Sequence, residues 1–205
     1  HPLGNVSTYR YNHETRKLYM AVNYPGIISQ IAEIDACTGD IRKLAELDSP
    51  SLYYSTHLAY DPDSNRVFIT EQNYKYRSLV MIDVKSGKKE TLIPFSRTGE
   101  LVFNQADRSI WGVRLDNGNS TLVKMPEPYQ SIIPIYEMPF GRAIFDLDIS
   151  SDGKYLSASI SGISGDQELA LFEIAQLEAG NTRYRSLHKL DDNTLTQFKF
   201  SIDNQ

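Results

Sequence analysis

The chain has 205 residues, of which 40% are hydrophobic and 23% are charged, and its formal net charge at pH 7 is −5. This composition is typical of a globular protein with one or two domains, and the acidic balance argues against a nucleic-acid partner. No apolar run approaches the ~20 residues of a membrane span, and the single cysteine, Cys37, excludes an internal disulfide.

Strand-like segments recur along the chain at a regular interval. An aromatic or aliphatic reference residue precedes a turn in each copy, and successive reference residues are 43 to 51 positions apart: Tyr11, Tyr60, Phe103, Ile149 and Phe200. Each has an apolar or aromatic residue two positions earlier, and the four complete copies have another apolar residue seven positions later. This alternation on both sides of a turn predicts a β-hairpin in every complete copy.

The turn of this hairpin has a different sequence in each copy. It reads NHETRK at 12–17, DPDSNR at 61–66, NQADRS at 104–109 and SSDGKY at 150–155. Gly153, after Asp152, supplies the positive-φ position of a tight hairpin at little steric cost. Asp61-Pro62 and Asn65 are also residues that turns select, whereas HETR is poor turn chemistry.

Two further apolar runs follow each hairpin. The third runs are IAEID, LVMID, TLVKM and LALFEI, and the fourth are IRKLAEL, KETLIPF, IIPIYEM and RYRSLHKL. Four strands in roughly 45 residues, repeated four times, predict an all-β fold, a β-propeller of four-stranded antiparallel blades. Such a sheet cannot cover its own apolar faces, so blades stack around an axis. A β-sandwich fits the regular spacing less well, and only AQLEAG, after Ile174, predicts a helical turn.

The repeats predict one β-propeller region over residues 1–205. Its blades are expected at about 8–50, 51–96, 97–141 and 142–192, and QFKFSIDNQ, within 193–205, starts a further blade. Four blades and a fragment would leave an apolar blade face exposed. We therefore expect a piece of a larger propeller from a longer chain. The alternative is that the last strand completes the first blade.

The segment DISSDGKYLSASI, followed by LALFEI, resembles a blade of the TolB-like, WD-repeat-like β-propellers. AYDPDSNRVFI and LVMIDVKSGKKETL resemble the same pattern, although Ser151 stands where proline is usual. The resemblance implies a β-propeller, a role in protein interaction and an exported, periplasmic bacterial setting. It implies no catalytic residue. The lone cysteine is equally compatible with the cytoplasm.

A polar residue stands three positions before each reference residue. These residues are Thr8, His57, Glu100, Asp146 and Gln197. Because the first strand of a blade runs along the central channel, we expect them to ring one mouth of it. His57, Glu100 and Asp146 are then candidate ligands of an axial metal ion or an acid–base set. The plainer interpretation, which we favour, is a solvated strand start.

Two tyrosine-rich loops are expected at the same mouth. Residues 51–57 read SLYYSTH and residues 73–78 read NYKYRS. They would form an aromatic patch with a basic tip, made of Tyr53, Tyr54, Tyr74, Tyr76 and Arg77. Tyrosine and arginine are enriched where proteins bind one another, although loop tyrosines also pack over the ends of blades.

The sequence contains no complete catalytic motif. GISGD lacks the spacing of a nucleophile elbow, and HETRK has a lysine in place of the second histidine of a zinc-binding helix. We therefore predict a non-enzymatic scaffold, without cofactor or metal, whose channel-mouth loops bind a protein or peptide partner. The alternatives are the propeller part of a larger hydrolase, peptidase or lyase with a ligand or metal site on the axis, and a propeller that packs on another domain of its parent chain.

Overall fold

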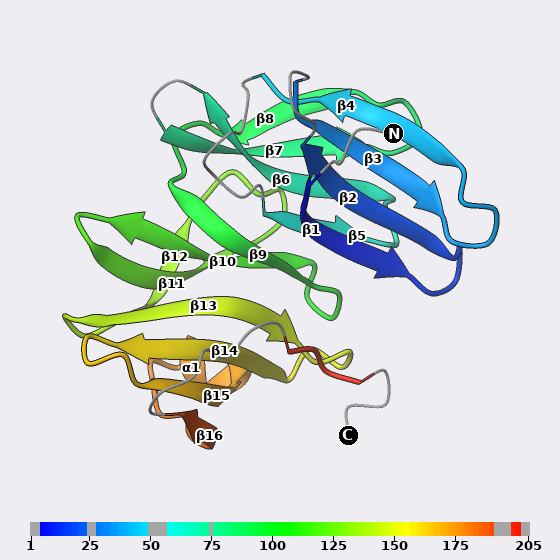
Figure 1. Cartoon of the computed structure of the whole chain (residues 1–205). Helices are drawn as coiled ribbons and strands as arrows, with labels where there is room; N and C mark the ends of the chain where they lie inside the picture. The colour runs from blue at the N-terminus through cyan, green and yellow to red at the C-terminus, as the bar shows by residue number, and fades with distance from the viewer. Residues whose placement is uncertain (1–4, 24–27, 49–56, 74–75, 191–197, 202–205) are drawn as a thin grey trace. The chain divides into compact units, whose positions relative to one another are not determined.

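The computed structural model of the protein describes residues 5–23, 28–48, 57–73, 76–190 and 198–201. Its strands form four antiparallel sheets, and each sheet consists of four strands that are consecutive in the sequence (Figure 1). These sheets are the predicted blades, so the all-β fold class is confirmed. The chain divides into two compact units, residues 1–101 and 102–205.

The first unit contains blades 1 and 2. Blade 1 consists of β1 (Asn5–Asn12), β2 (Lys17–Asn23), β3 (Gln30–Asp35) and β4 (Ile41–Glu46). Blade 2 consists of β5 (Leu58–Asp61), β6 (Arg66–Asn73), β7 (Tyr76–Asp83) and β8 (Lys89–Ile93). Blade 1 takes all four strands from residues 5–46, so it is complete without a strand from the end of the chain.

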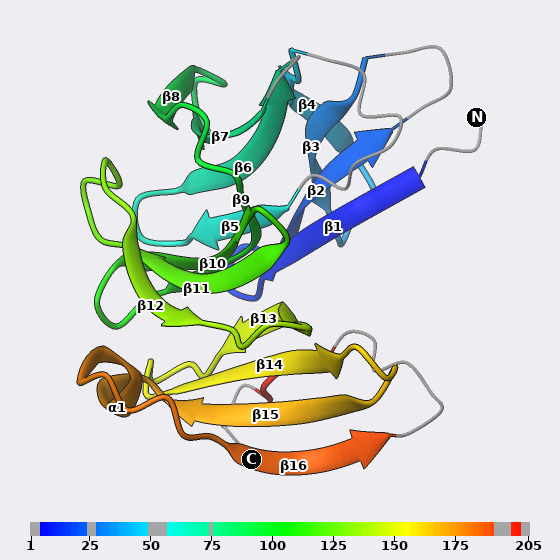
Figure 2. The same ribbon diagram turned by 90° about the vertical axis from the view of Figure 1, so that its left-hand side faces the viewer.

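The second unit contains blade 4 and most of blade 3 (Figure 2). Blade 3 consists of β9 (Thr98–Asn104), whose first four residues belong to the first unit, β10 (Ser109–Asp116), β11 (Asn119–Met125) and β12 (Ile133–Glu137). Blade 4 consists of β13 (Arg142–Ile149), β14 (Tyr155–Gly162), β15 (Gln167–Glu173) and β16 (Arg185–Leu190). The one helix in the described part of the chain is α1 (Ile174–Glu178), where the sequence predicts a helical turn.

The first hairpin turn keeps one geometry in blades 1 to 3 although its sequence changes. Arg16, Asn65 and Arg108 each stand five residues after the reference residue, and their φ angles are 54°, 54° and 57°. In blade 1, Oδ1 of Asn12 accepts hydrogen bonds from two backbone N–H groups of the turn, at 2.9 and 3.1 Å. This side-chain capping explains how NHETRK forms a hairpin although HETR is poor turn chemistry.

Blade 4 uses the predicted glycine turn. Gly153 has a φ of 71°. A Cβ at this position would lie 2.5 Å from Oδ1 of Asn104 and would overlap the Cβ of Ala106. The turns of blades 3 and 4 therefore approach each other within the second unit at a point where only glycine fits.

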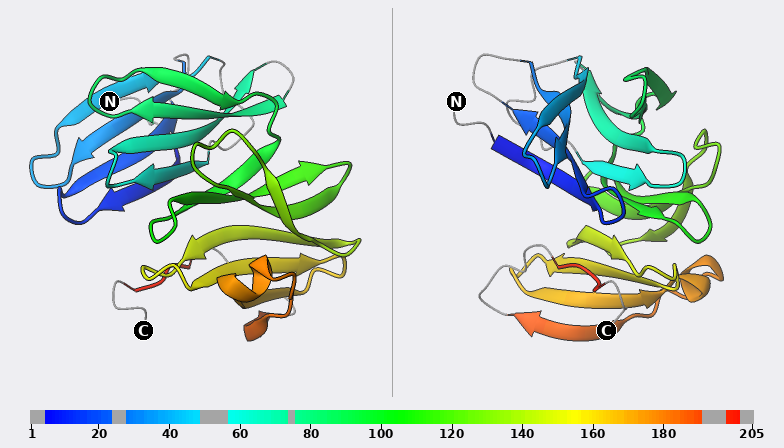
Figure 3. Two further views of the ribbon diagram at one scale, coloured as in Figure 1. Left: turned by 180° about the vertical axis from the view of Figure 1, so that it is seen from behind. Right: turned by 90° about the vertical axis from the view of Figure 1, so that its right-hand side faces the viewer.

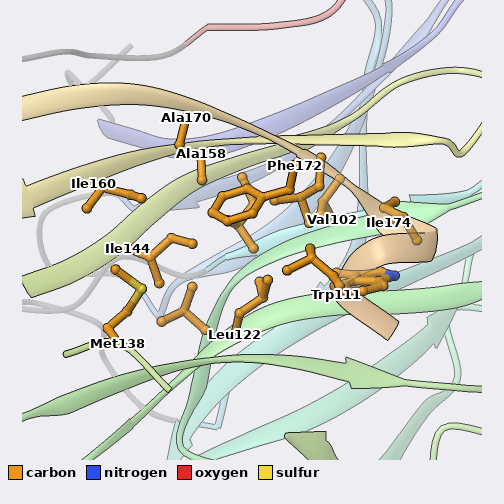
Figure 4. Close-up of a cluster of buried hydrophobic side chains, with 14 residues drawn as sticks. Val102, Trp111, Leu122, Met138, Ile144, Ala158, Ile160, Ala170, Phe172 and Ile174 are labelled. Carbon is orange, nitrogen blue, oxygen red and sulfur yellow. The ribbon is translucent and has the colours of Figure 1, made fainter. Parts of the chain in front are cut away.

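An apolar cluster joins the two blades of each unit. In the first unit, blade 1 contributes Tyr19, Ala21 and Ile31, and blade 2 contributes Leu58, Tyr60, Val67, Ile69, Val80 and Ile82. In the second unit (Figure 4), blade 3 contributes Trp111, Val113 and Leu122, and blade 4 contributes Leu147, Leu156, Ala158, Ile160, Ala170 and Phe172. Most of these residues alternate along the second and third strands, so one face of each strand meets the neighbouring blade.

Ion pairs of the buried Glu33 carboxylate in blade 1 include Arg42, which also contacts blade 2. The Glu33 carboxylate, 7% exposed, lies 2.9 Å from Nζ of Lys17 and 3.1 Å from Nη2 of Arg42. Arg42 also donates a hydrogen bond to the carbonyl of Val84, which follows β7. Burial by itself would raise the pKa of Glu33, but hydrogen bonds from Arg42 and Lys17 outweigh it and hold this pKa below its usual value.

Gly153→Ala is expected to lower the free energy of unfolding by about 2–4 kcal/mol, because it adds left-handed backbone strain to overpacking. Gly165→Ala is the matched control: Gly165 has a φ of 88°, and nothing lies within 4 Å of its added Cβ. In this control only the backbone strain is added, so the free energy of unfolding should fall by about 1 kcal/mol. Urea unfolding measures both variants, and equal losses would contradict the close approach of the two turns.

Glu33→Gln is expected to lower the free energy of unfolding at pH 7 by about 1–3 kcal/mol, since charged hydrogen bonds are lost. The folded-state pKa of Glu33 is depressed, so its stabilising contribution exists above the unfolded pKa of about 4.3 and disappears as the pH falls through the folded value. Urea unfolding from neutral to acidic pH should show the two proteins converging. Glu46→Gln is the control: this carboxylate is 51% exposed and pairs with the similarly exposed Lys43, so its loss should change the free energy of unfolding by less than about 1 kcal/mol. A difference that stays constant down to strongly acidic pH would refute this account.

Candidate functional site

Each blade has an end at which two kinds of loop meet. Because neighbouring strands are antiparallel, the loop between the second and third strands lies at the same end as the connection that leads into the first strand. We call this the loop end of the blade. The sequence places its candidate binding residues in these loops and in the adjoining first strands.

Three predicted residues come together in the first unit. His57 directly precedes β5, Arg77 is in β7 and Glu100 is in β9. Nδ1 of His57 lies 3.5 Å from Oε1 of Glu100. A Cβ on Gly99 would lie 2.7 Å from Nη1 of Arg77 and 3.3 Å from Nε2 of His57, so both side chains approach the Gly99 backbone. We call His57, Arg77, Gly99 and Glu100 the mouth cluster.

Hydrogen bonds fix the segments that carry the mouth cluster. The N–H of His57 donates to Oγ1 of Thr70, and the N–H of Thr70 donates to the His57 carbonyl, both at 3.0 Å. The Arg77 carbonyl accepts hydrogen bonds from the N–H of Arg97 at 3.0 Å and the hydroxyl of Ser96 at 3.2 Å. The connection from β8 to β9 is therefore tied to the start of β7, which brings Gly99 to Arg77.

The same connection and the beginning of β9 contain strained backbone. Phe95, Arg97 and Glu100 have φ angles of 55°, 55° and 50°, in the left-handed region that residues other than glycine rarely adopt. Asp146, which occupies the position of Glu100 in blade 4, has a φ of 51°. Such strain persists where the surrounding structure fixes it, and it is frequent at binding and catalytic sites. Blades 3 and 4 thus share this conformation at equivalent positions.

The mouth cluster offers both donors and acceptors to solvent. The side chains of His57 and Glu100 are 19% and 26% exposed. A guanidinium supplies N–H donors, a carboxylate supplies acceptors and an imidazole can supply either, which suits a peptide backbone or a polar side chain as ligand. Within the described residues, no group of three or more His, Cys, Asp or Glu side chains is placed to hold a metal ion.

The other predicted residues are not part of the mouth cluster as described. Asp146 lies in β13 of the second unit. Tyr76 is the first residue of β7, and the structure describes only its backbone. Tyr53, Tyr54 and Tyr74 lie outside the described residues. The aromatic patch therefore stays a prediction.

Sequence reasoning missed two exposed apolar residues at the loop end of blade 4. Phe140 lies in the connection from β12 to β13 and is 92% exposed, and Ile163 lies in the β14–β15 loop and is 85% exposed. A Cβ on Gly141 would lie 3.4 Å from the Cβ of Ile163, so the two loops lie against each other. We call Phe140 and Ile163 the apolar pair. Its sequence signal is a large apolar residue beside a glycine in a loop, in PFGR and GISGD.

Backbone hydrogen bonds order both loops of the apolar pair. The N–H of Arg142 donates to the Pro139 carbonyl at 3.0 Å. In the second loop, the N–H of Gly162 donates to the Asp166 carbonyl at 2.9 Å, and the N–H of Gly165 donates to the Gly162 carbonyl at 3.1 Å. Loops that are already ordered lose less conformational entropy on binding, which favours affinity.

Comparison with known proteins identifies the fold. No protein-family profile matches the chain, and no curated protein sequence matches it. A solved structure assigned as TolB from Agrobacterium tumefaciens is 13% identical with a TM-score of 0.71, and the match covers 89% of this chain and 64% of that one. The chain has a TolB-like β-propeller fold.

Two further similar structures have different functions. A chain of a nidogen–laminin complex is 10% identical with a TM-score of 0.68, over 89% of this chain and 64% of that one. An oligogalacturonate lyase in complex with manganese is 11% identical with a TM-score of 0.65, over 96% of this chain and 56% of that one. This chain therefore spans less than two thirds of each matched chain, and the likeness concerns the fold alone. In the described part of the chain, no helix is long and apolar enough to cross a membrane.

Glu100→Gly is expected to be more stable than Glu100→Ala by about 1 kcal/mol, because both remove the side chain but only glycine adopts a φ of 50° without strain. Urea unfolding of the two variants measures the difference. The same pair of substitutions at Thr91, an exposed residue of β8, should give the opposite order, since glycine weakens a regular strand. An alanine variant as stable as the glycine variant at position 100 would contradict backbone strain there.

Proposed function

We propose that the chain is a non-enzymatic β-propeller scaffold that binds a protein or peptide partner through the loop ends of its blades. The observation that carries this proposal is the apolar pair: two large side chains, 92% and 85% exposed, on loops that lie against each other. Single exposed apolar residues are normal on a protein surface, whereas adjacent ones are typical of interaction sites. Burying such a side chain contributes about 1.5–3 kcal/mol.

The mouth cluster supports a polar contribution to binding from the first unit. Arginine is enriched at protein interfaces, where its planar group makes several hydrogen bonds at once. Tyr53, Tyr54, Tyr74 and Tyr76 would add aromatic contacts beside Arg77. The matched nidogen–laminin structure is itself a complex of two proteins. The resemblance to TolB-like blades supports the periplasm, or another exported location, as the setting.

A second candidate function is the propeller part of a larger enzyme with a ligand or metal site on the axis. It is favoured by the contact between His57 and Glu100 and by the left-handed backbone of Glu100. The manganese-bound lyase among the similar structures is consistent with it. Since the described residues hold no cluster of metal ligands, such a site would need further groups.

The double substitution Phe140→Ser and Ile163→Ser is expected to weaken partner binding by about 30-fold or more, since anchor residues contribute at least 1 kcal/mol each. Partners are captured on the wild-type chain from an extract of the source cells, identified, purified and titrated by calorimetry. Thermal unfolding should be unchanged, because both side chains are exposed.

Ile41→Ser is the matched control, because Ile41 is 65% exposed but begins β4 at the opposite end of its blade. It should bind like the wild type. A partner that binds the double variant as tightly as the wild type would refute a role for the apolar pair. A ligand lost only on His57→Ala and Glu100→Gln would favour the second candidate function.

A further inference from the structure

Blade 4 has an open groove on the face that does not meet blade 3. The groove has a volume of about 850 Å³, and its lining comes from β14, β15, α1, the connection from α1 to β16, β16 itself and the end of the described chain. Its apolar residues include Tyr155, Leu169, Leu171 and Leu187. Tyr155 and Leu187 are 38% and 45% exposed. Leu169 and Leu171 alternate with Ala170 and Phe172, which are buried against blade 3.

Equivalent positions in the other blades indicate what this face of blade 4 contacts. Ser157 and Leu169 occupy the positions that Trp111 and Leu122 have in blade 3, as the strand pairings show: Ser159 pairs with Leu169 as Val113 pairs with Leu122. Trp111 and Leu122 are buried against the following blade in the second unit. Their counterparts in blade 1 are likewise buried against the following blade in the first unit. The groove therefore lies at the same place in the repeat. Leu169 keeps the apolar residue of that place, and Leu171 stands where blade 3 has Lys124.

The described end of the chain already lies in the groove. Phe198 and Phe200 line it, and residues 198–201, red in Figures 1 and 3, lie beside blade 4. The N–H of Phe200 donates to Oδ2 of Asp148 at 2.8 Å, and Nζ of Lys199 lies 3.0 Å from Oδ1 of the same carboxylate.

The positions of Phe198 and Phe200 in the repeat match those of residues already buried between blades. Leu58 and Tyr60 hold these positions in the first strand of blade 2, and both belong to the apolar cluster of the first unit. Leu147 and Ile149 hold them in blade 4, where Leu147 is part of the second cluster and Ile149 packs against it. Phe198 and Phe200 thus occupy the groove as the first strand of a following blade would.

We propose that this groove is a docking surface for the second and third strands of a fifth blade whose first strand begins at Phe198. The second strand of this fifth blade would place alternating aliphatic or aromatic residues against Leu169 and Leu171. In the two formed clusters, Val67 and Ile69 face blade 1 in this way, and Leu156 and Ala158 face blade 3. Arg183 and Arg185 line the groove and would favour acidic residues at its rim. The inference concerns a different surface from the proposed partner site and does not depend on it.

The test extends the chain with a copy of its own blade. Gln205 has the repeat position of Lys154, so a second copy of residues 155–190 joined directly after Gln205 continues the register. The extended chain should unfold about 5 °C or more above the 205-residue chain and bind less of the apolar dye ANS. The matched control carries the same extension with serine at its copies of Leu156, Ile160 and Phe172. It should show neither the higher melting temperature nor the lower ANS binding.

Leu169→Ser with Leu171→Ser provides a second measurement. This double substitution should lower the melting temperature of the extended chain more than that of the 205-residue chain. Equal melting temperatures and ANS binding for the extended chain and its polar control would overturn the proposal. So would a concentration-dependent dimer of the 205-residue chain that this double substitution abolishes, because the groove would then be an interface between two copies.

Discussion

Burial between consecutive blades is the constraint on which the rest of this structure depends. A four-stranded sheet has two faces, and its own strands cover neither of them. In each unit the second and third strands of one blade meet those of the next, and the aromatic residues Tyr19 and Trp111 hold the same position in that contact. Both are almost completely buried. The regular spacing of apolar residues in the sequence reflects this repeated interface, since each copy must supply both sides of it.

The inter-blade contacts also explain where the strained backbone is tolerated. The connection from β8 to β9 joins the last strand of blade 2 to the first strand of blade 3 within a few residues. Phe95 and Arg97 in the connection and Glu100 in β9 have left-handed backbone, which costs about 1–2 kcal/mol for each residue. Hydrogen bonds to the Arg77 carbonyl and the largely buried strand β9 fix the path. The core of the blades thus stabilises a loop conformation that these residues would not adopt by themselves.

Much of the fold could be predicted because its elements are local and periodic. Alternation with a period of two identified the strands, and Gly153 identified one hairpin turn by its chemistry. The turn at NHETRK was harder to predict, because it depends on the capping oxygen of Asn12 and on a left-handed Arg16. Arginine favours left-handed backbone far less than glycine does. The equivalent turns of the repeat were the better guide.

The candidate site could be predicted only in part. His57 and Glu100 were found because they share one repeat position, but their contact with Gly99 and Arg77 depends on how three segments of the first unit pack together. Phe140 and Ile163 were missed because an apolar residue in a sequence is normally assigned to the core. Only the structure shows that their loops place them in solvent.

The groove on blade 4 shows how the repeat can vary while its interface stays the same. Ser157 replaces the large aromatic residue that Tyr19 and Trp111 supply in the two formed contacts. Protein interiors are close-packed, so volume lost on one side of an interface must be regained on the other. Phe198 and Phe200 lie against this face, and Phe198 is larger than Leu58 and Leu147, which hold its position in the formed contacts. The larger side chain of Phe198 thus offsets part of the volume that Ser157 leaves on the face of blade 4.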